Sequence, residues 1–61
     1  MTIDPQISLL AEEFARDLVS EVGREAVEKA GGRQKVAQRL ATAMQQAVEQ
    51  EYGALVEELR P

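Results

Sequence analysis

The sequence predicts an all-α fold, an antiparallel two-helix hairpin that dimerises into a four-helix bundle. Apolar residues recur at helical spacing in two long runs, a Gly31-Gly32 pair separates these runs, and no strand-like alternation occurs. A chain of 61 residues makes one domain at most. Residues 1–61 are therefore expected to form a single hairpin domain, with helix 1 over about 5–30, a turn at 31–32 and helix 2 over about 33–59.

The first predicted helix has clear signals at both ends. Asp4 is a preferred N-cap residue, and Pro5 suits the first helical position because its missing N–H is not needed there. Gly31 suits the left-handed position that follows a helix, and Lys29 interacts favourably with the dipole of the last turn. The apolar residues between these ends are Ile7, Leu10, Ala11, Phe14, Ala15, Leu18, Val22 and Ala26.

The second predicted helix carries its own apolar run and must return along the first. A two-residue glycine link forces two helices to run antiparallel. Residues whose numbers add to about 63 should then lie opposite each other, small against large. The run is Val36, Leu40, Met44, Ala47, Val48, Tyr52, Leu55 and Leu59, and the expected pairs are Ala11 with Tyr52, Ala15 with Val48, Gly23 with Leu40 and Leu10 with Gly53.

The width of the apolar face on each helix predicts self-association. The face covers an arc of roughly 180°, more than one neighbouring helix covers. A second copy would supply the missing neighbours, and a heterologous partner that supplies the missing helices fits the same pattern. The predicted oligomer interface is Ile7, Leu10, Phe14, Leu18, Val22, Leu40, Met44, Val48, Tyr52 and Leu55. Leu9, Val27 and Val56 lie outside this face or at its edge and are either exposed apolar residues or a docking surface.

The composition points away from catalysis. Without His or Cys, the nucleophilic arrangements that need them and the usual zinc and haem ligands are impossible. We expect no enzymatic activity, no cofactor and no metal. Neighbouring acids such as Glu21 and Glu25 are expected to form a solvated face, with a site for a cation or a basic partner as the alternative. The net charge of −4 disfavours broad nucleic-acid binding. No membrane-spanning segment or basic signal-peptide start is visible, so a cytoplasmic location is expected.

Two polar features have competing interpretations. Glu51 falls within the apolar arc of helix 2, either as a solvated carboxylate or as a residue that sets register or partner choice. Basic residues gather around the glycine turn, namely Arg24, Lys29, Arg33, Lys35 and Arg39. They form a solubilising tip, a contact for the acidic ends of a second copy, or a polyanion contact.

The sequence favours a small interaction protein of regulatory or adaptor type that acts as a homodimer. One alternative is a dimeric nucleic-acid-binding regulator that uses the basic turn. Another is an accessory structural subunit that folds only with a different protein.

Overall fold

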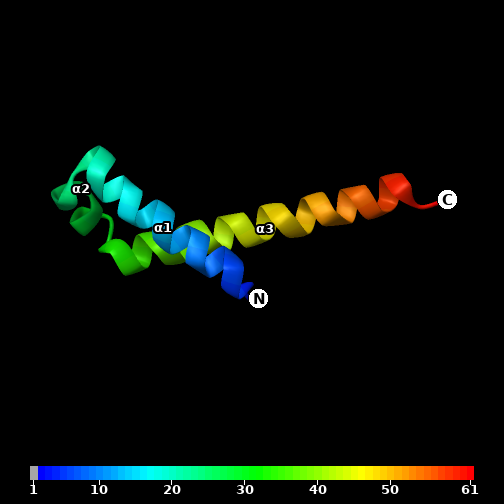
Figure 1. Ribbon diagram of the computed structural model, residues 1–61, viewed down its shortest axis with the longest axis horizontal. Coiled ribbons are helices and arrows are strands. Elements are labelled where there is room, and N and C mark those ends of the chain that lie inside the picture. The colour runs from blue at the N-terminus through cyan, green and yellow to red at the C-terminus, as the bar shows by residue number, and fades with distance from the viewer. Residues whose placement is uncertain (1) are drawn as a thin grey trace.

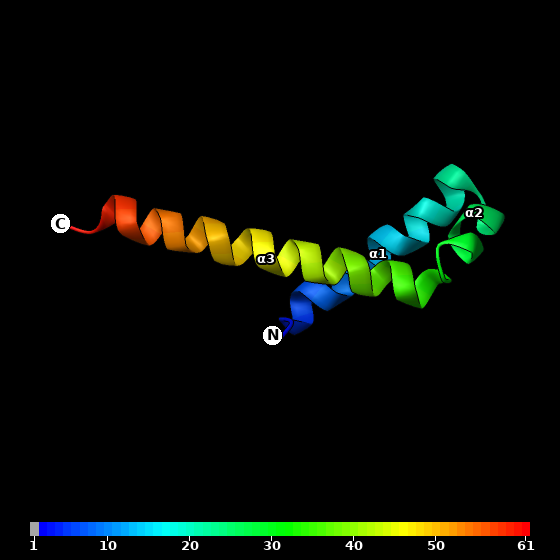
Figure 2. The same cartoon turned by 180° about the vertical axis from the view of Figure 1, so that it is seen from behind.

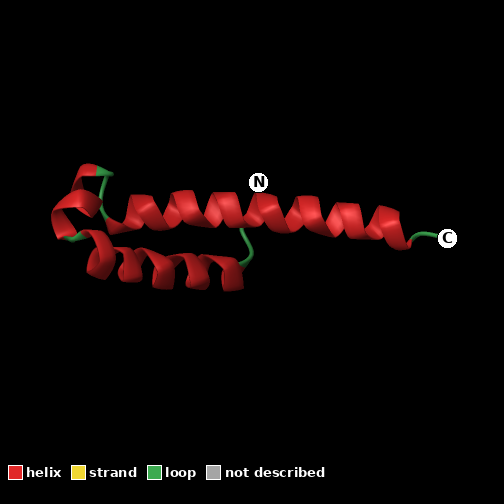
Figure 3. Cartoon of the chain, turned by 90° about the horizontal axis from the view of Figure 1, so that it is seen from above, coloured by secondary structure: helices red, strands yellow, loops and turns green. Residues whose placement is uncertain are grey.

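The computed structural model describes residues 2–61 as three α-helices: α1 (Pro5–Val22), α2 (Arg24–Lys29) and α3 (Arg33–Leu59) (Figure 1). The all-α prediction is confirmed, and the described residues contain no strand. The molecule is elongated, with extents of 51 × 21 × 17 Å. Its long dimension follows α3, which runs the length of the molecule, while α1 lies along only part of it (Figure 3).

The start of α1 follows the predicted chemistry. Asp4 is the N-cap, and its Oδ1 accepts a hydrogen bond from the Gln6 N–H at 2.7 Å. Pro5 occupies the first helical position, where no N–H is required. The bond satisfies one of the backbone donors that every helix start leaves unpaired, so the beginning of α1 is well defined.

The single helix expected over residues 5–30 is wrong, because Gly23 divides it. Gly23 has φ 92° and ψ 153°, a conformation that side-chain-bearing residues rarely adopt, and α2 leaves it in a new direction. Gly31 and Gly32 also have positive φ, at 108° and 93°, and return the chain into α3. Seen from behind, α2 forms the bend that joins α1 to α3 (Figure 2).

The bend changes which residues of α1 and α3 are neighbours. The two helices still run in opposite directions, but the Asp4 N–H donates to Gln45 Oε1 at 2.9 Å and Ala15 packs with Val36, so paired residue numbers add to about 50 instead of about 63. The expected pairs Ala11 with Tyr52 and Ala15 with Val48 are therefore wrong, as are Gly23 with Leu40 and Leu10 with Gly53. The residues taken up by α2 account for this shift toward the start of α3.

The core is small and is built from small side chains. Its buried residues are Ala11, Ala15, Val27, Val36 and Ala41, and among residues 2–61 no large side chain is fully buried. Leu18, Val19, Ala37 and Leu40 pack around it half-buried. Close approach of α1 and α3 through alanines makes these contacts, and the larger apolar residues lie mostly outside them.

Val27 is the clearest departure from the expected pattern. A continuous helix would place it on the polar side with Leu9, but it is only 5% exposed and packs with Ala15 and Val36. Gly23 redirects α2 and so turns Val27 inward. Leu9 remains 62% exposed, as the pattern of α1 predicts, and Val56 is half-buried.

Candidate interaction surfaces

The most prominent surface feature is the second half of α3, which extends past the start of α1. Gln45 lies beside Asp4, at the point where α1 begins, so neither of the other two described helices lies next to residues 46–59. We call this segment the overhang. Figure 3 shows it continuing beyond the start of α1 toward the C-terminus. At about 1.5 Å rise per residue it is about 20 Å long.

One face of the overhang is an exposed apolar stripe. Its members follow the 4-3-4 spacing of a helix face that packs against another helix. Tyr52 is 70% exposed and Leu59 is 77% exposed. The overhang stripe consists of Val48, Tyr52, Leu55 and Leu59.

The overhang stripe repeats the part of α3 that contacts α1. Ala37, Ala41 and Met44, which are buried or half-buried, recur eleven residues later as Val48, Tyr52 and Leu55. Eleven residues make three helical turns at about 3.67 residues per turn, so both sets lie on one face. The first set is covered by α1 and the second is uncovered. The sequence therefore extends a helix-binding face beyond the helix that the chain itself provides.

A second apolar surface, which the chain itself covers only in part, lies along one side of the α1–α3 contact. On α1 it contains Leu10 and Phe14, of which Phe14 is 50% exposed. With about 100° of rotation per residue, Leu40 and Ala43 of α3 lie toward the same side. We call these four residues the apolar flank. Its large side chains border the core without entering it, because alanines occupy the line of closest approach.

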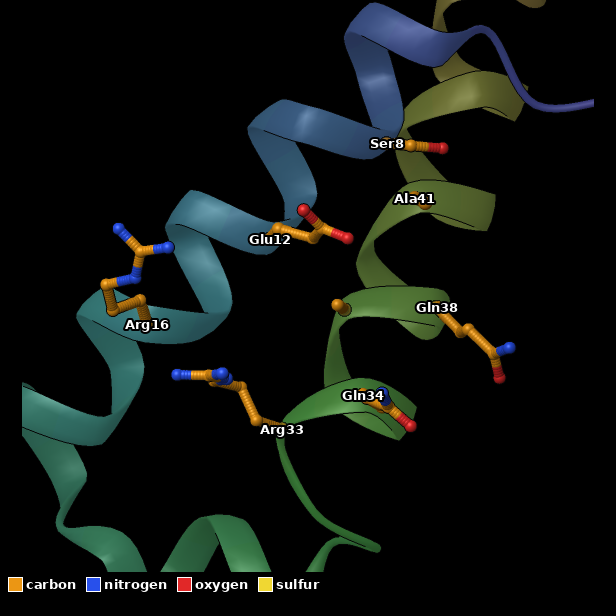
Figure 4. Close-up of a pocket in the computed structure, with 8 residues that line it drawn as sticks. Ser8, Glu12, Arg16, Arg33, Gln34, Gln38 and Ala41 are labelled. Carbon is orange, nitrogen blue, oxygen red and sulfur yellow. The ribbon is translucent and has the colours of Figure 1, made fainter.

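The opposite side of the α1–α3 contact is a polar groove of about 490 Å³ (Figure 4). Glu12 extends from α1 toward α3, and Arg33 extends from the start of α3 toward α1 (Figure 4). The other lining residues are Ser8, Arg16, Gln34, Ala37, Gln38 and Ala41. The charged and amide side chains of the groove are exposed.

The structure divides the predicted interface residues into three groups. Leu18, Leu40 and Met44 are half-buried, as is Ile7, and Leu18 and Leu40 pack within the chain itself. Leu10, Phe14 and Val22 are exposed on α1, Val22 because α1 ends there. Val48, Tyr52 and Leu55 form the overhang stripe with Leu59, which belongs to the predicted apolar run.

Glu51 lies on the overhang and is exposed. Because α1 begins at Pro5, Glu51 lies beyond the α1–α3 contact, and neither of the other two described helices lies beside it. Within the described residues the ion pairs are Lys29–Glu25 at 3.8 Å and Arg60–Glu57 at 3.5 Å, both between well-exposed side chains. Pairs of this kind contribute little to stability.

The predicted basic residues fall on two helices around the bend. Arg24 and Lys29 are the first and last residues of α2, and Arg33, Lys35 and Arg39 lie in the first two turns of α3. All five are exposed. The acids Glu25 and Glu28 lie between them on α2, so the basic character is strongest along the start of α3.

The sequence pattern missed the inward turn of Val27 and the length of the overhang, and both depend on the break at Gly23. The eleven-residue recurrence in α3 was a readable signal of the overhang stripe. In the described part of the chain, no three acidic side chains gather as a metal site would require. None of the described helices is long and apolar enough to cross a membrane. Comparison with protein-family models, curated proteins and solved structures gives no match.

Proposed function

We propose that this chain is a small, non-enzymatic interaction protein of regulatory or adaptor type that works as a homo-oligomer through the overhang stripe. The observation that carries the proposal is the stripe itself, four apolar side chains in helix-packing spacing with no helix of the same chain over them. Burying such side chains stabilises an assembly by about 1.5–3 kcal/mol each when burial is complete.

The small core supports the same proposal. Its buried side chains are alanine and valine, and chains near this size rarely reach high stability from one core alone. The chain has no Cys for a disulfide and no His. Association with another helical surface is the remaining way to cover its larger apolar residues, which include Phe14 and Tyr52. Two copies would bring two α1 and two α3 helices together.

A pair of charge-matched variants tests the proposal. Leu55→Asp places a carboxylate in the overhang stripe, whereas Gln50→Asp places one on the opposite side of the same helix. In sedimentation equilibrium, we expect Leu55→Asp to weaken self-association by at least about tenfold, because a charge would be buried without a partner. Gln50→Asp should associate as the wild-type chain does. Equal behaviour of the two variants would refute the role of the stripe.

The purified chain can also be tested for binding to nucleic acid. The exposed Arg33 and Lys35 favour it, whereas the neighbouring acids and the net charge of −4 disfavour it. We expect no salt-resistant shift of a DNA or RNA duplex in gels at about 150 mM salt. A shift that Arg33→Ala and Lys35→Ala abolish would replace the interaction proposal by a nucleic-acid one.

A further inference from the structure

We infer that the overhang of one copy packs on the apolar flank of a second copy, with the two α3 helices antiparallel. This inference rests on the proposed self-association and names its geometry. Each end of the dimer would then contain α1 and the first half of α3 from one copy and the overhang from the other. The partner of the overhang stripe is thus Leu10, Phe14, Leu40 and Ala43 of a second identical chain.

The two halves of α3 carry charges of opposite sign, and this difference favours an antiparallel pair of α3 helices. Residues 33–45 contain three basic residues and no acid. Residues 46–60 contain the four acids Glu49, Glu51, Glu57 and Glu58 and one basic residue, Arg60. Two overhangs packed on each other would bring their acids together, whereas antiparallel α3 helices bring each acidic half to a basic half.

The overhang and the apolar flank also match in length. The overhang is about 20 Å long, and the part of α3 that lies beside α1, residues 33–45, has nearly the same length of about 20 Å. An overhang laid along the flank would therefore cover it from the bend to the start of α1. The flank is already paired on one side by its own α1–α3 contact, so a third helix would complete a three-helix cluster with a larger core.

Charged residues on the borders of the two surfaces are also complementary. Arg39 follows Val36 by three residues and precedes Ala43 by four, so it lies on the border of the apolar flank on α3. Glu51 and Glu58 lie on one border of the overhang stripe, one turn and three turns along from Ala47. Antiparallel docking brings the Arg39 border near the Glu51 border. This contact gives Glu51 the partner-choosing role that its position suggests.

A charge-reversal experiment tests the arrangement. The basic-half variant carries Lys35→Glu and Arg39→Glu, and the acidic-half variant carries Glu51→Lys and Glu58→Lys. We expect each variant alone to associate about tenfold or more weakly than the wild type, because like charges then meet at both contacts. An equimolar mixture should regain wild-type association within about threefold, because opposite charges meet again. Circular dichroism of each variant checks that its helices remain.

The outcomes separate this inference from the proposal on which it rests. If wild-type chains stay monomeric, the homo-oligomeric function fails. If they associate but the basic-half variant associates equally well, the overhang does not meet the basic half and only the present inference fails. The same holds if mixing the two variants does not restore association.

A distance measurement gives a second readout that does not depend on charge. The chain has no Cys, so Glu57→Cys provides one spin-label site on the side of the overhang away from the stripe. Antiparallel α3 helices centred near residue 46 would separate the two labels by about 30 Å along the helix axis. Antiparallel overhangs packed on each other would separate them by only about 14 Å along that axis. The shorter separation would overturn the inference.

Discussion

Replacing Gly23 with alanine should oppose the bend between α1 and α2. Gly23 has φ 92° and ψ 153°, and a Cβ placed there would meet no atom within 4 Å. The penalty is therefore conformational and not a steric clash with neighbours. Holding alanine in such a region costs about 1–3 kcal/mol. Alanine also favours a continuous helix over glycine by about 1 kcal/mol. The substitution should therefore raise the free energy of the bent form by about 2–4 kcal/mol relative to a straight helix over residues 5–30.

Amide hydrogen exchange gives the sharpest assay of this change. The first amides of α2, those of Arg24, Glu25 and Ala26, have no helical acceptor in the bent form but would gain one in a straight helix. We expect them to become protected in Gly23→Ala, while urea unfolding shows a free energy lower by about 1–3 kcal/mol. Gly53→Ala is the control, because Gly53 lies inside α3 with open space around it. It should raise stability by about 0.5–1 kcal/mol without affecting these amides. Unchanged exchange and stability in Gly23→Ala would refute the account of the bend.

Two further substitutions test the start of α1 and the core. Asp4→Ala should lower the free energy of unfolding by about 1 kcal/mol, because the Gln6 N–H loses its acceptor. Asp4→Asn should retain most of the wild-type stability, because its side-chain oxygen can still accept this bond. Equal stability of the two variants in urea titrations would contradict the capping role of Asp4. Ala15→Leu should lower it by about 1–3 kcal/mol, because Ala15 is completely buried where α1 meets α3, and the exposed Ser20→Leu should change it by less than about 0.5 kcal/mol. Equal changes in the free energy of unfolding for these two leucine variants would contradict the position of Ala15 in the core.

The start of α1, the end of α2 and both ends of α3 were predictable because each depends on local chemistry. Asp4 and Pro5 begin α1, and Gly31 and Gly32 adopt the positive φ values expected where the chain turns into α3. The bounds of α3, Arg33–Leu59, agree with the expected 33–59. These features involve residues within one turn of each other, so composition and spacing are sufficient to recognise them.

The break at Gly23 was not predictable from the apolar pattern. Val19, Val22 and Ala26 keep helical spacing across it, and a single glycine in a helix usually costs only about 1 kcal/mol. What favours the break is tertiary, since bending lets Val27 pack against Ala15 and Val36. The register of α1 on α3 depends on that bend, so the predicted pairs were wrong although the helix directions were right.

The candidate surface was only partly predictable for the same reason. The pattern selected Val48, Tyr52 and Leu55 as apolar positions that need a partner, and they are exposed. The pattern also selected Leu18 and Leu40, which pack within the chain itself. Separating the two groups requires knowing where α1 begins beside α3, and the contact between Asp4 and Gln45 fixes that point.

Sedimentation equilibrium of the unmodified chain over about 10–500 μM tests the central claim most directly, with urea unfolding followed at both ends of this range. Because the overhang stripe needs a second helix surface, we expect the apparent mass to rise from 6.7 kDa toward twice that value. The unfolding midpoint should rise with concentration in parallel. A mass of 6.7 kDa throughout, with cooperative unfolding at a midpoint independent of concentration, would contradict the account.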